Sequence, residues 1–259
     1  MRIALKIVLV LVVLLAVAAG VLYLIASAVP AAYQPAALSR EQREGAAKAF
    51  VNTVLAEVHN RAEDARPFEM TFTQGELNSY LASADEIVEL HYAHKAGDAS
   101  RAMDEAGISS PAVTLDDGVL TFMCRLTKYD KVLSVDLAFA FDEAGKLRVS
   151  VAGARLGRLP APGSLVRRAV EEMKRRLPEP DAERREGGGP LGAGAPTSED
   201  VGAALRAVAG GIDGDGVPTA FGFRRERRIR LTDVEIADGK ITLRFEPVRP
   251  LPRRPAHAD

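Results

Sequence analysis

The sequence predicts an α+β fold in which an N-terminal transmembrane helix precedes a single twisted antiparallel sheet packed on amphipathic helices. A meander and a C-terminal hairpin would form this sheet. Two observations lead to this prediction. The run Ile7–Val29 contains twenty-three residues without a charge, almost all of them apolar. Further along the chain, the spacing of apolar residues changes from three and four over 39–60 to two over 119–151, which is the change from helix to strand periodicity.

The uncharged run predicts a membrane anchor. A helix needs about 20 apolar residues to cross a bilayer, and Ile7–Val29 meets that length. Arg2 and Lys6 precede the run, whereas the next charged residue is Arg40. The positive-inside rule then makes the N-terminus cytoplasmic. We therefore expect residues 1–31 to be a single-pass anchor in the cell membrane and the rest of the chain to be extracytoplasmic.

A cleaved signal peptide is the alternative to an anchor. Ala26-Ser27-Ala28 has the small-residue form of a cleavage site, but a signal peptide has an apolar core of only about 7–15 residues. Tyr23 also lies near the outer end of the run, where aromatic residues collect at membrane interfaces. The length of the run and the position of Tyr23 favour the anchor, and both interpretations export the remaining chain.

Charge and cysteine content narrow the class of protein. Lysine and arginine number 34 and aspartate and glutamate 35, a formal net charge of −1. Nucleic-acid-binding domains are basic, so we expect no nucleic-acid partner. Cys124 is the only cysteine; no internal disulfide can form, and the fold must depend on its apolar core. Cys124 alternates with Phe122 and Leu126, which predicts a buried core cysteine.

The first part of the exported chain predicts helices around one short strand. Ser39 opens an amphipathic helix over 39–60 with a capping box, completed by the glutamine three residues later. Alternating apolar residues predict a strand over 68–72, and Thr73 opens a short helix with a second capping box. Residues 98–107 are typical of an exposed helix.

The central part predicts an antiparallel meander. Three segments alternate apolar and polar residues, 119–126, 133–141 and 147–151, and short turn sequences separate them. One face of this sheet is apolar. The opposite face, which we expect to meet water, carries Thr121, Arg125, Ser134, Asp136, Arg148 and Ser150.

The last part of the chain predicts an amphipathic helix, a flexible linker, a helix with a β-hairpin, and a disordered tail. The linker has too few apolar residues to pack. The extracytoplasmic α+β domain would thus run over 32–177 and be completed beyond the linker. In chain order, the amphipathic helix spans 164–177, the linker 178–197, the helix with the hairpin 198–248 and the tail 249–259.

No motif predicts an active site or a metal site. His91 and His94 would share a helix face, but the H-E-x-x-H pattern and a third ligand are absent. Asp213 and Asp215 resemble the start of a calcium loop whose later ligand positions lack oxygen side chains. We expect no metal, no cofactor and no enzymatic activity. A hydrolase with an unfamiliar motif is the alternative.

A basic run near the C-terminal hairpin predicts a surface contact. It contains Arg224, Arg225, Arg227 and Arg228. These side chains would form either the solvated face of a strand or a contact with anionic lipid headgroups. Each lysine or arginine near such a membrane surface adds about 1 kcal/mol to binding.

Two longer motifs resemble a known family. Thr73-Gln-Gly-Glu-Leu-Asn-Ser-Tyr-Leu81 begins a helix, and the meander ends in Val151-Ala-Gly-Ala-Arg-Leu-Gly-Arg-Leu-Pro-Ala-Pro162. Together with the N-terminal anchor, they resemble the YpmS-like anchored extracytoplasmic proteins, with their T-x-x-E-L-N helix and G-x-L-x-x-P strand end. Those proteins are similar in turn to the tubular lipid-binding (TULIP) superfamily. The resemblance covers residues 39–177 and the closing hairpin, and the linker 178–197 departs from the family pattern.

The resemblance implies a curved sheet that encloses acyl chains. Its apolar groove would be lined by Leu120, Phe122, Leu133, Val135, Leu137, Phe139 and Phe141. Alternatively, this face packs against the helix 39–60, because a sheet with one apolar face must cover it. We therefore expect a membrane-anchored, non-enzymatic protein that binds lipid or another long apolar ligand. The alternative is an envelope assembly or scaffolding protein that contacts a protein partner without a ligand.

Overall fold

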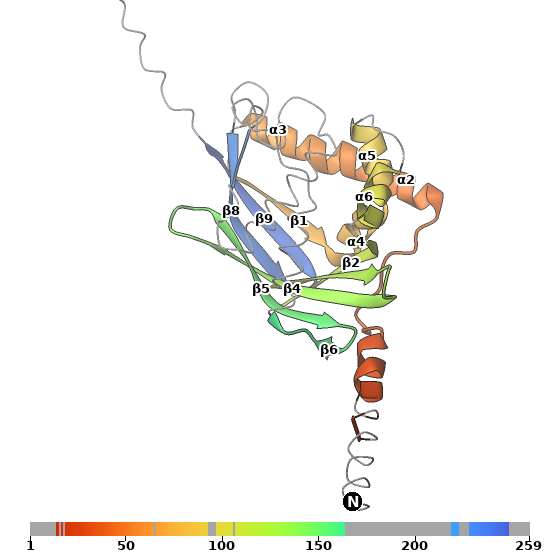
Figure 1. Cartoon of the computed structure of the whole chain (residues 1–259). Coiled ribbons are helices and arrows are strands. Elements are labelled where there is room, and N and C mark those ends of the chain that lie inside the picture. Colours follow the sequence, from red (N-terminus) through yellow and green to blue (C-terminus); the bar gives the residue numbers. More distant parts are fainter. Residues whose placement is uncertain are drawn as a thin grey trace, which may run out of the picture.

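The computed structural model describes residues 14–15, 17, 19–64, 66–92, 97–105, 107–163, 219–222 and 228–248. They form two antiparallel sheets, a group of helices on one side, and an N-terminal helix that projects from the domain (Figure 1). The α+β class with antiparallel sheets is therefore confirmed. Among the described residues, no helix is long and apolar enough to cross a membrane.

Several predicted segments lie outside the described residues. They are the first half of the anchor, the helix 164–177, the linker 178–197, the helix at the start of 198–248 and the tail 249–259.

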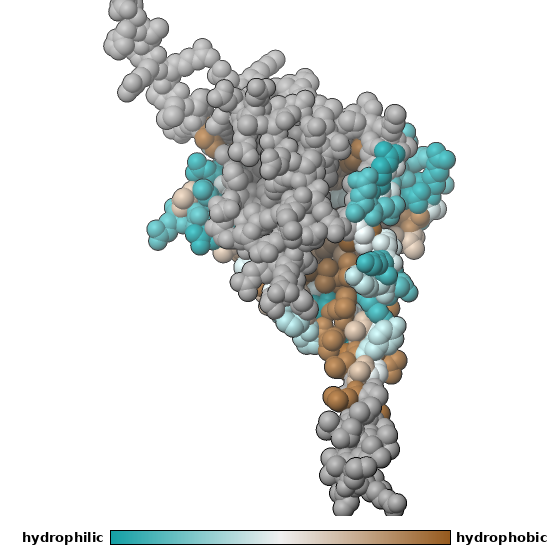
Figure 2. All heavy atoms as spheres, in the orientation of Figure 1, coloured by the Kyte–Doolittle hydropathy of each residue, from teal (hydrophilic) through white to brown (hydrophobic). Residues whose placement is uncertain are grey.

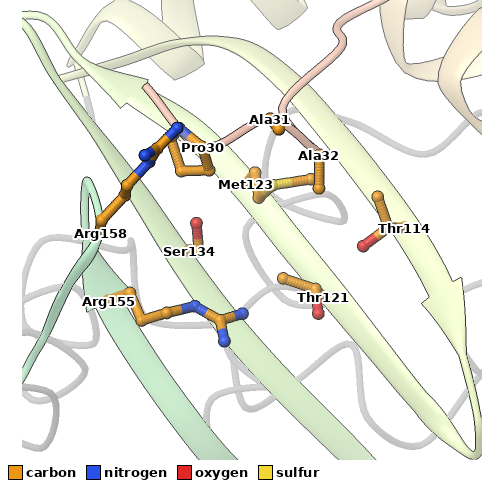
Figure 3. A pocket seen from close by; sticks show the side chains of 9 residues that line it. All are labelled: Pro30, Ala31, Ala32, Thr114, Thr121, Met123, Ser134, Arg155 and Arg158. Atoms are coloured by element: carbon orange, nitrogen blue, oxygen red, sulfur yellow. The ribbon is translucent and has the colours of Figure 1, made fainter. Parts of the chain in front are cut away.

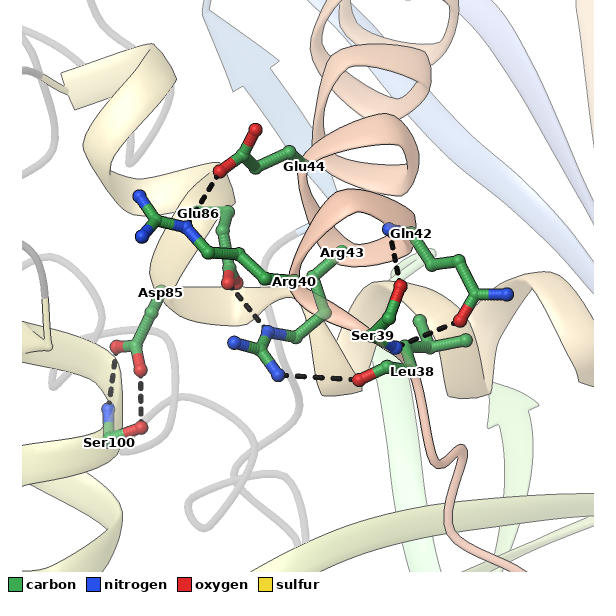
Figure 4. Close-up of polar contacts among 9 residues, drawn as sticks. All are labelled: Leu38, Ser39, Arg40, Gln42, Arg43, Glu44, Asp85, Glu86 and Ser100. Atoms are coloured by element: carbon green, nitrogen blue, oxygen red, sulfur yellow. Dashed lines mark hydrogen bonds and ion pairs between the residues drawn. The ribbon is translucent and has the colours of Figure 1, made fainter.

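A long helical stretch follows residues 30–38, which connect it to the N-terminal helix and are called the N-terminal linker. It consists of α2 (Arg40–Ala49), the π-helical segment η1 (Phe50–Leu55) and α3 (Ala56–Asp64), where the sequence predicts one uniform helix. Its predicted capping box is confirmed (Figure 4). The Gln42 backbone N–H donates to Ser39 Oγ at 3.2 Å, and the Ser39 N–H donates to Gln42 Oε1 at 2.8 Å.

Two short helices extend this group; they are α5 (Ala84–Tyr92) and α6 (Asp98–Glu105). An ion pair ties α5 to α2, because Arg43 Nε donates to Glu86 Oε1 at 2.6 Å. The Ser100 backbone N–H donates to Asp85 Oδ1 at 2.9 Å and joins α6 to α5 (Figure 4). Polar contacts therefore fix the three helices relative to one another.

The predicted meander belongs to a five-stranded antiparallel sheet in the order β2-β3-β4-β5-β6. One face, called the inner face, carries the predicted apolar stripe, with Leu120 opposite Leu137 and Phe139 opposite Val149. The other face is called the outer face. The strands are β2 (Ile108–Asp116), β3 (Val119–Leu126), β4 (Lys131–Phe141), β5 (Leu147–Leu156) and β6 (Leu159–Pro160).

The C-terminal hairpin forms part of a second sheet, so the prediction of a single sheet is wrong. This four-stranded sheet has the order β1-β9-β8-β7. The predicted hairpin forms, and its turn lies at Asp238 and Gly239, which both have the positive φ that a tight hairpin turn requires. The strands are β1 (Phe68–Thr73), β7 (Ala220–Gly222), β8 (Arg228–Ala237) and β9 (Lys240–Val248).

The helix α4 (Gln74–Ala82) lies along β2, an edge strand of the five-stranded sheet. The Asn78 side-chain amide donates to the Val113 carbonyl at 3.0 Å and accepts from the Val113 N–H at 2.7 Å. Gln74 Oε1 accepts from the Leu115 N–H at 3.1 Å. These side chains occupy the free edge of β2, and the hairpin strand β9 pairs with β1 in the other sheet.

The two sheets and the long helical stretch share an apolar core. At one end, Met70, Ile229 and Phe245 of the four-stranded sheet contact the inner-face residues Phe141 and Leu147. The helical side chains Val54 and Val58 pack against the same cluster. At the other end, the inner-face residues Leu115, Leu120 and Phe139 contact Ile236 and Ile241. The inner face is thus covered at both ends by the second sheet.

Candidate ligand-binding site

The N-terminal helix ends against the five-stranded sheet (Figure 1). The Arg158 backbone N–H, in the turn between β5 and β6, donates to the Ile25 carbonyl at 3.1 Å. Lys131 begins β4 and places its ammonium group 4.2 Å from the centre of the Tyr23 ring. The same ammonium donates to the Ser27 hydroxyl. The helix end is therefore held by two turns of one sheet.

Gly157 permits this close approach. Its φ of +60° lies in the left-handed region that favours glycine. A Cβ at this position would lie 2.3 Å from the Ala26 carbonyl oxygen and 2.9 Å from that of Ala28. The Gly157 N–H donates to the Val132 carbonyl at 2.7 Å, which fixes the turn to the sheet. Any side chain here would force the turn and the helix apart.

Tyr33 fixes the N-terminal linker to the five-stranded sheet. Its side chain is only 8% exposed. It packs on three residues of the outer face, Ala112, Met123 and Val132. Its hydroxyl donates to the Ser110 carbonyl at 2.8 Å. The outer face, which the sequence predicts to be solvated, is therefore covered by the linker at this end.

A pocket of about 350 Å³ lies where the linker crosses the outer face (Figure 3). The linker forms one wall, and strands β2 to β5 form the floor. The lining combines apolar side chains with hydroxyl and guanidinium groups, a composition that suits an amphipathic or anionic group. The lining residues are Pro30, Ala31, Ala32, Thr114, Thr121, Met123, Ser134, Arg155 and Arg158.

Asp136 organises the polar part of the floor. Thr121 Oγ1 and Arg155 Nη2 each donate to Asp136 Oδ1 at 2.7 Å. Gly153 leaves room for this carboxylate, because a Cβ there would lie 2.8 Å from Asp136 Oδ2. The positive charge of Arg155 is therefore balanced within the sheet.

Two other lining groups have no such partner within the described part of the chain. Ser134 is 1% exposed, and its hydroxyl makes no hydrogen bond there. Arg158 is exposed, and its guanidinium group pairs with no described carboxylate. Figure 3 shows Ser134 between the guanidinium groups of Arg155 and Arg158. Buried polar groups are nearly always hydrogen-bonded, so the free Ser134 hydroxyl distinguishes this pocket.

The predicted apolar groove lies on the inner face, away from this pocket. Leu120, Phe139 and Phe141 pack against the four-stranded sheet and belong to the core. None of the seven predicted groove residues lines the pocket, and a lipid groove on the inner face stays a prediction. Besides Leu120, Phe139 and Phe141, the predicted groove has four residues, and all four are partly buried: Phe122, Leu133, Val135 and Leu137.

The other predicted sites can be placed only in part. Of the basic run, Arg228 begins β8, opposite Val248, and a membrane contact there stays a prediction. No cluster of three or more histidine, cysteine, aspartate or glutamate side chains among the described residues could hold a metal ion. The positions outside the described residues are Arg224, Arg225, Arg227, His94, Asp213 and Asp215.

Cys124 is buried, as predicted. It is 2% exposed, and burial raises the pKa of its thiol to about 11. We expect iodoacetamide to leave the folded chain unlabelled at about pH 8 and to label it fully after unfolding, as measured by intact mass. Rapid labelling of the folded chain would contradict this burial.

The Cys124 thiol ionises at lower pH in the unfolded chain than in the folded chain, so the free energy of unfolding should fall as pH rises from about 9 to about 11.

Sequence reasoning placed Ser134 and Asp136 on the correct face but missed the pocket. It assigned that face to water, and it singled out neither Arg155 nor Arg158. The available signal is the proline and alanine content of 30–32, which suits a segment lying flat on a sheet. Nothing in the sequence indicates which face such a segment would cover.

None of the protein-family models, curated proteins or solved structures compared with the chain matches it. The resemblance to the YpmS-like proteins therefore stays an expectation based on the two motifs quoted above.

Proposed function

We propose that the chain is a membrane-anchored, extracytoplasmic and non-enzymatic protein that binds a lipid or another long apolar ligand. The observation that carries this proposal is the pocket of about 350 Å³ beside the end of an exposed apolar helix. A lipid in the same membrane would reach the pocket without leaving the apolar surface of the helix.

The exposure of the N-terminal helix supports the anchor. Nine large apolar side chains among the described residues of 14–29 are between 37% and 68% exposed. Figure 2 shows apolar side chains gathered on this helix and continuing onto the adjoining part of the domain. Water-soluble domains rarely expose contiguous apolar patches of this kind, and a bilayer would cover this one.

The dimensions and lining of the pocket support ligand binding. Pockets for small molecules typically measure about 300–1,000 Å³ and combine apolar walls with a few polar groups. The inner face offers a second apolar surface for a long ligand, since Leu133, Val135 and Leu137 are only partly buried.

The chemistry of the Ser134 hydroxyl and the Cys124 thiol supports binding over catalysis at these two groups. A nucleophilic serine needs a base within hydrogen-bond distance, and the Ser134 hydroxyl has no such partner in the described part of the chain. The Cys124 thiol is buried, and the rise in its pKa to about 11 keeps it protonated at neutral pH.

An envelope assembly or scaffolding role is the alternative. Outside the N-terminal helix, the large apolar side chains exposed among the described residues are Leu90 and Tyr129. They belong to different elements, α5 and the β3–β4 turn. Partner-binding surfaces present larger contiguous patches, so the described surface favours a ligand over a partner.

Native mass spectrometry of the full chain, extracted from membranes in a mild detergent, tests ligand binding. We expect part of the protein to retain a lipid after the micelle is removed. Protein that is always bare would overturn lipid binding, and a bound second protein in place of a lipid would favour the scaffolding role.

The proposed topology has its own test. An alkaline phosphatase fused after Asp259 folds only outside the cytoplasm, so we expect it to be active. A fluorescent protein that folds only in the cytoplasm is the matched fusion, and it should stay dark. The reverse pattern would overturn the extracytoplasmic location.

A further inference from the structure

We infer that the pocket binds the phosphate of an anionic membrane-lipid headgroup, with Arg158 supplying the charge and Ser134 a hydrogen-bond donor. The inference depends on the proposed function in one respect, namely that the N-terminal helix lies in a bilayer. It goes further by naming the chemical group that the pocket recognises.

The position of the pocket relative to the apolar run is the first argument. Tyr23 lies near the outer end of the run, where aromatic side chains mark the membrane interface. A helix rises about 1.5 Å per residue, so the five steps from Tyr23 to Ala28 cover about 7 Å. The headgroup layer of a bilayer is about 5–7 Å thick on each side. The turn at Arg158, bonded to Ile25, therefore lies at the depth of the phosphates.

The charge of the pocket is the second argument. Asp136 balances Arg155 through a contact of 2.7 Å, whereas Arg158 pairs with no carboxylate in the described part of the chain. The polar lining therefore carries one unmatched positive charge, and a phosphodiester carries one negative charge. A guanidinium group also matches the geometry of phosphate oxygens.

The free hydroxyl of Ser134 is the third argument. It is 1% exposed and makes no hydrogen bond within the described residues, which is costly for a buried polar group. A phosphate oxygen in the pocket would accept this hydrogen bond. The apolar wall of Pro30 and Ala31 would then face the glycerol and acyl part of the same lipid.

Titration of the full chain in detergent, followed by native mass spectrometry, tests the inference. The probes are dioleoylphosphatidylglycerol, dioleoylglycerol and inorganic phosphate. The first two share their acyl chains and differ in the headgroup phosphate. We expect phosphatidylglycerol to bind at least about tenfold more tightly than either of the other probes, which corresponds to one charge-assisted contact.

Three variants assign the effect to residues. Arg158→Gln should weaken phosphatidylglycerol binding about tenfold and leave dioleoylglycerol binding unchanged. Arg40→Gln is the matched control, since Arg40 is exposed on α2 and its one ion pair among the described residues is with Glu44, at 3.0 Å. Ser134→Ala should weaken phosphatidylglycerol binding about fivefold, the size of one neutral hydrogen bond. Its melting temperature should equal or exceed that of the wild type, because an unpaired buried hydroxyl is removed.

The outcomes separate this inference from the proposed function. Equal binding of phosphatidylglycerol and dioleoylglycerol, unchanged in Arg158→Gln, would overturn headgroup recognition while lipid binding stands. Inorganic phosphate that binds as tightly as phosphatidylglycerol would identify a free-anion site and overturn the lipid source. Binding of no lipid at all would overturn the proposed function as well.

Discussion

Replacing Gly157 with alanine is expected to lower the free energy of unfolding by about 3 kcal/mol and to loosen the N-terminal helix from the sheet. The new Cβ would lie 2.3 Å from the Ala26 carbonyl oxygen. The left-handed backbone adds about 1–2 kcal/mol for any residue with a Cβ. Urea unfolding of the purified full chain measures the first effect. Hydrogen exchange at the Arg158 amide, which donates to Ile25, measures the second and should become faster.

Gly145 provides the matched control. Its φ is +71°, but a Cβ there would meet no atom within 4 Å. Gly145→Ala should therefore cost only the backbone part, about 1 kcal/mol, and leave the Arg158 amide protected. If the two variants lose the same stability, the close approach at Gly157 contributes nothing and the description of the docked helix is wrong.

Replacing Asn78 with alanine is expected to lower the free energy of unfolding by about 2–4 kcal/mol. The variant removes both hydrogen bonds between the side-chain amide and the Val113 backbone. The Val113 N–H and carbonyl are buried at this edge, and each unpaired buried group costs about 1–3 kcal/mol. Chemical unfolding followed by circular dichroism measures the loss.

Ser79→Ala, in the same helix, controls for this substitution. The Ser79 hydroxyl donates only to the Gly75 carbonyl one turn earlier, at 2.9 Å, in an exposed position. The change in stability should stay within about 0.5 kcal/mol, as for most surface substitutions. A loss in Asn78→Ala no larger than that in Ser79→Ala would show that the edge of β2 does not depend on the amide.

Features decided by neighbouring residues could be predicted from the sequence. The capping boxes at Ser39 and Thr73 each need two side chains three residues apart, and both form. The turn at Asp238 and Gly239 needs two residues that accept positive φ, and it forms as well. Alternation also assigned the apolar stripe of the meander to one face, because strand side chains alternate regardless of what covers them.

The division into two sheets could not be predicted in the same way. At the edge of β2, where another strand would pair, the backbone instead contacts Asn78, which lies 35 residues from Val113 in the chain. In the sequence, Asn78 is the asparagine of the T-x-x-E-L-N motif, and that motif does not indicate which strand the amide contacts. Only the folded chain shows that its amide has the donor and acceptor spacing of a neighbouring strand.

The candidate site was predicted less well than the fold for a related reason. Periodicity places Ser134 on the outer face of the sheet, but it does not say what covers that face. Arg155 reaches the same face only through the register shift between β4 and β5, which alternation does not predict. The cover comes from the linker held by Tyr33, whose hydroxyl bonds Ser110, 77 residues later in the chain. Patterns within one strand carry no information about such distant contacts.

The side chains of α4 along β2 also bear on solubility. An uncovered edge strand invites the same strand of another molecule to pair with it, which is a common route to aggregation. Here Asn78 and Gln74 already bond backbone groups of Val113 and Leu115. At its opposite edge, the sheet ends in the two-residue strand β6, which contains Pro160 and gives an incoming strand little to extend. Crowded copies of this protein would thus find few backbone groups on either margin of the meander through which to polymerise.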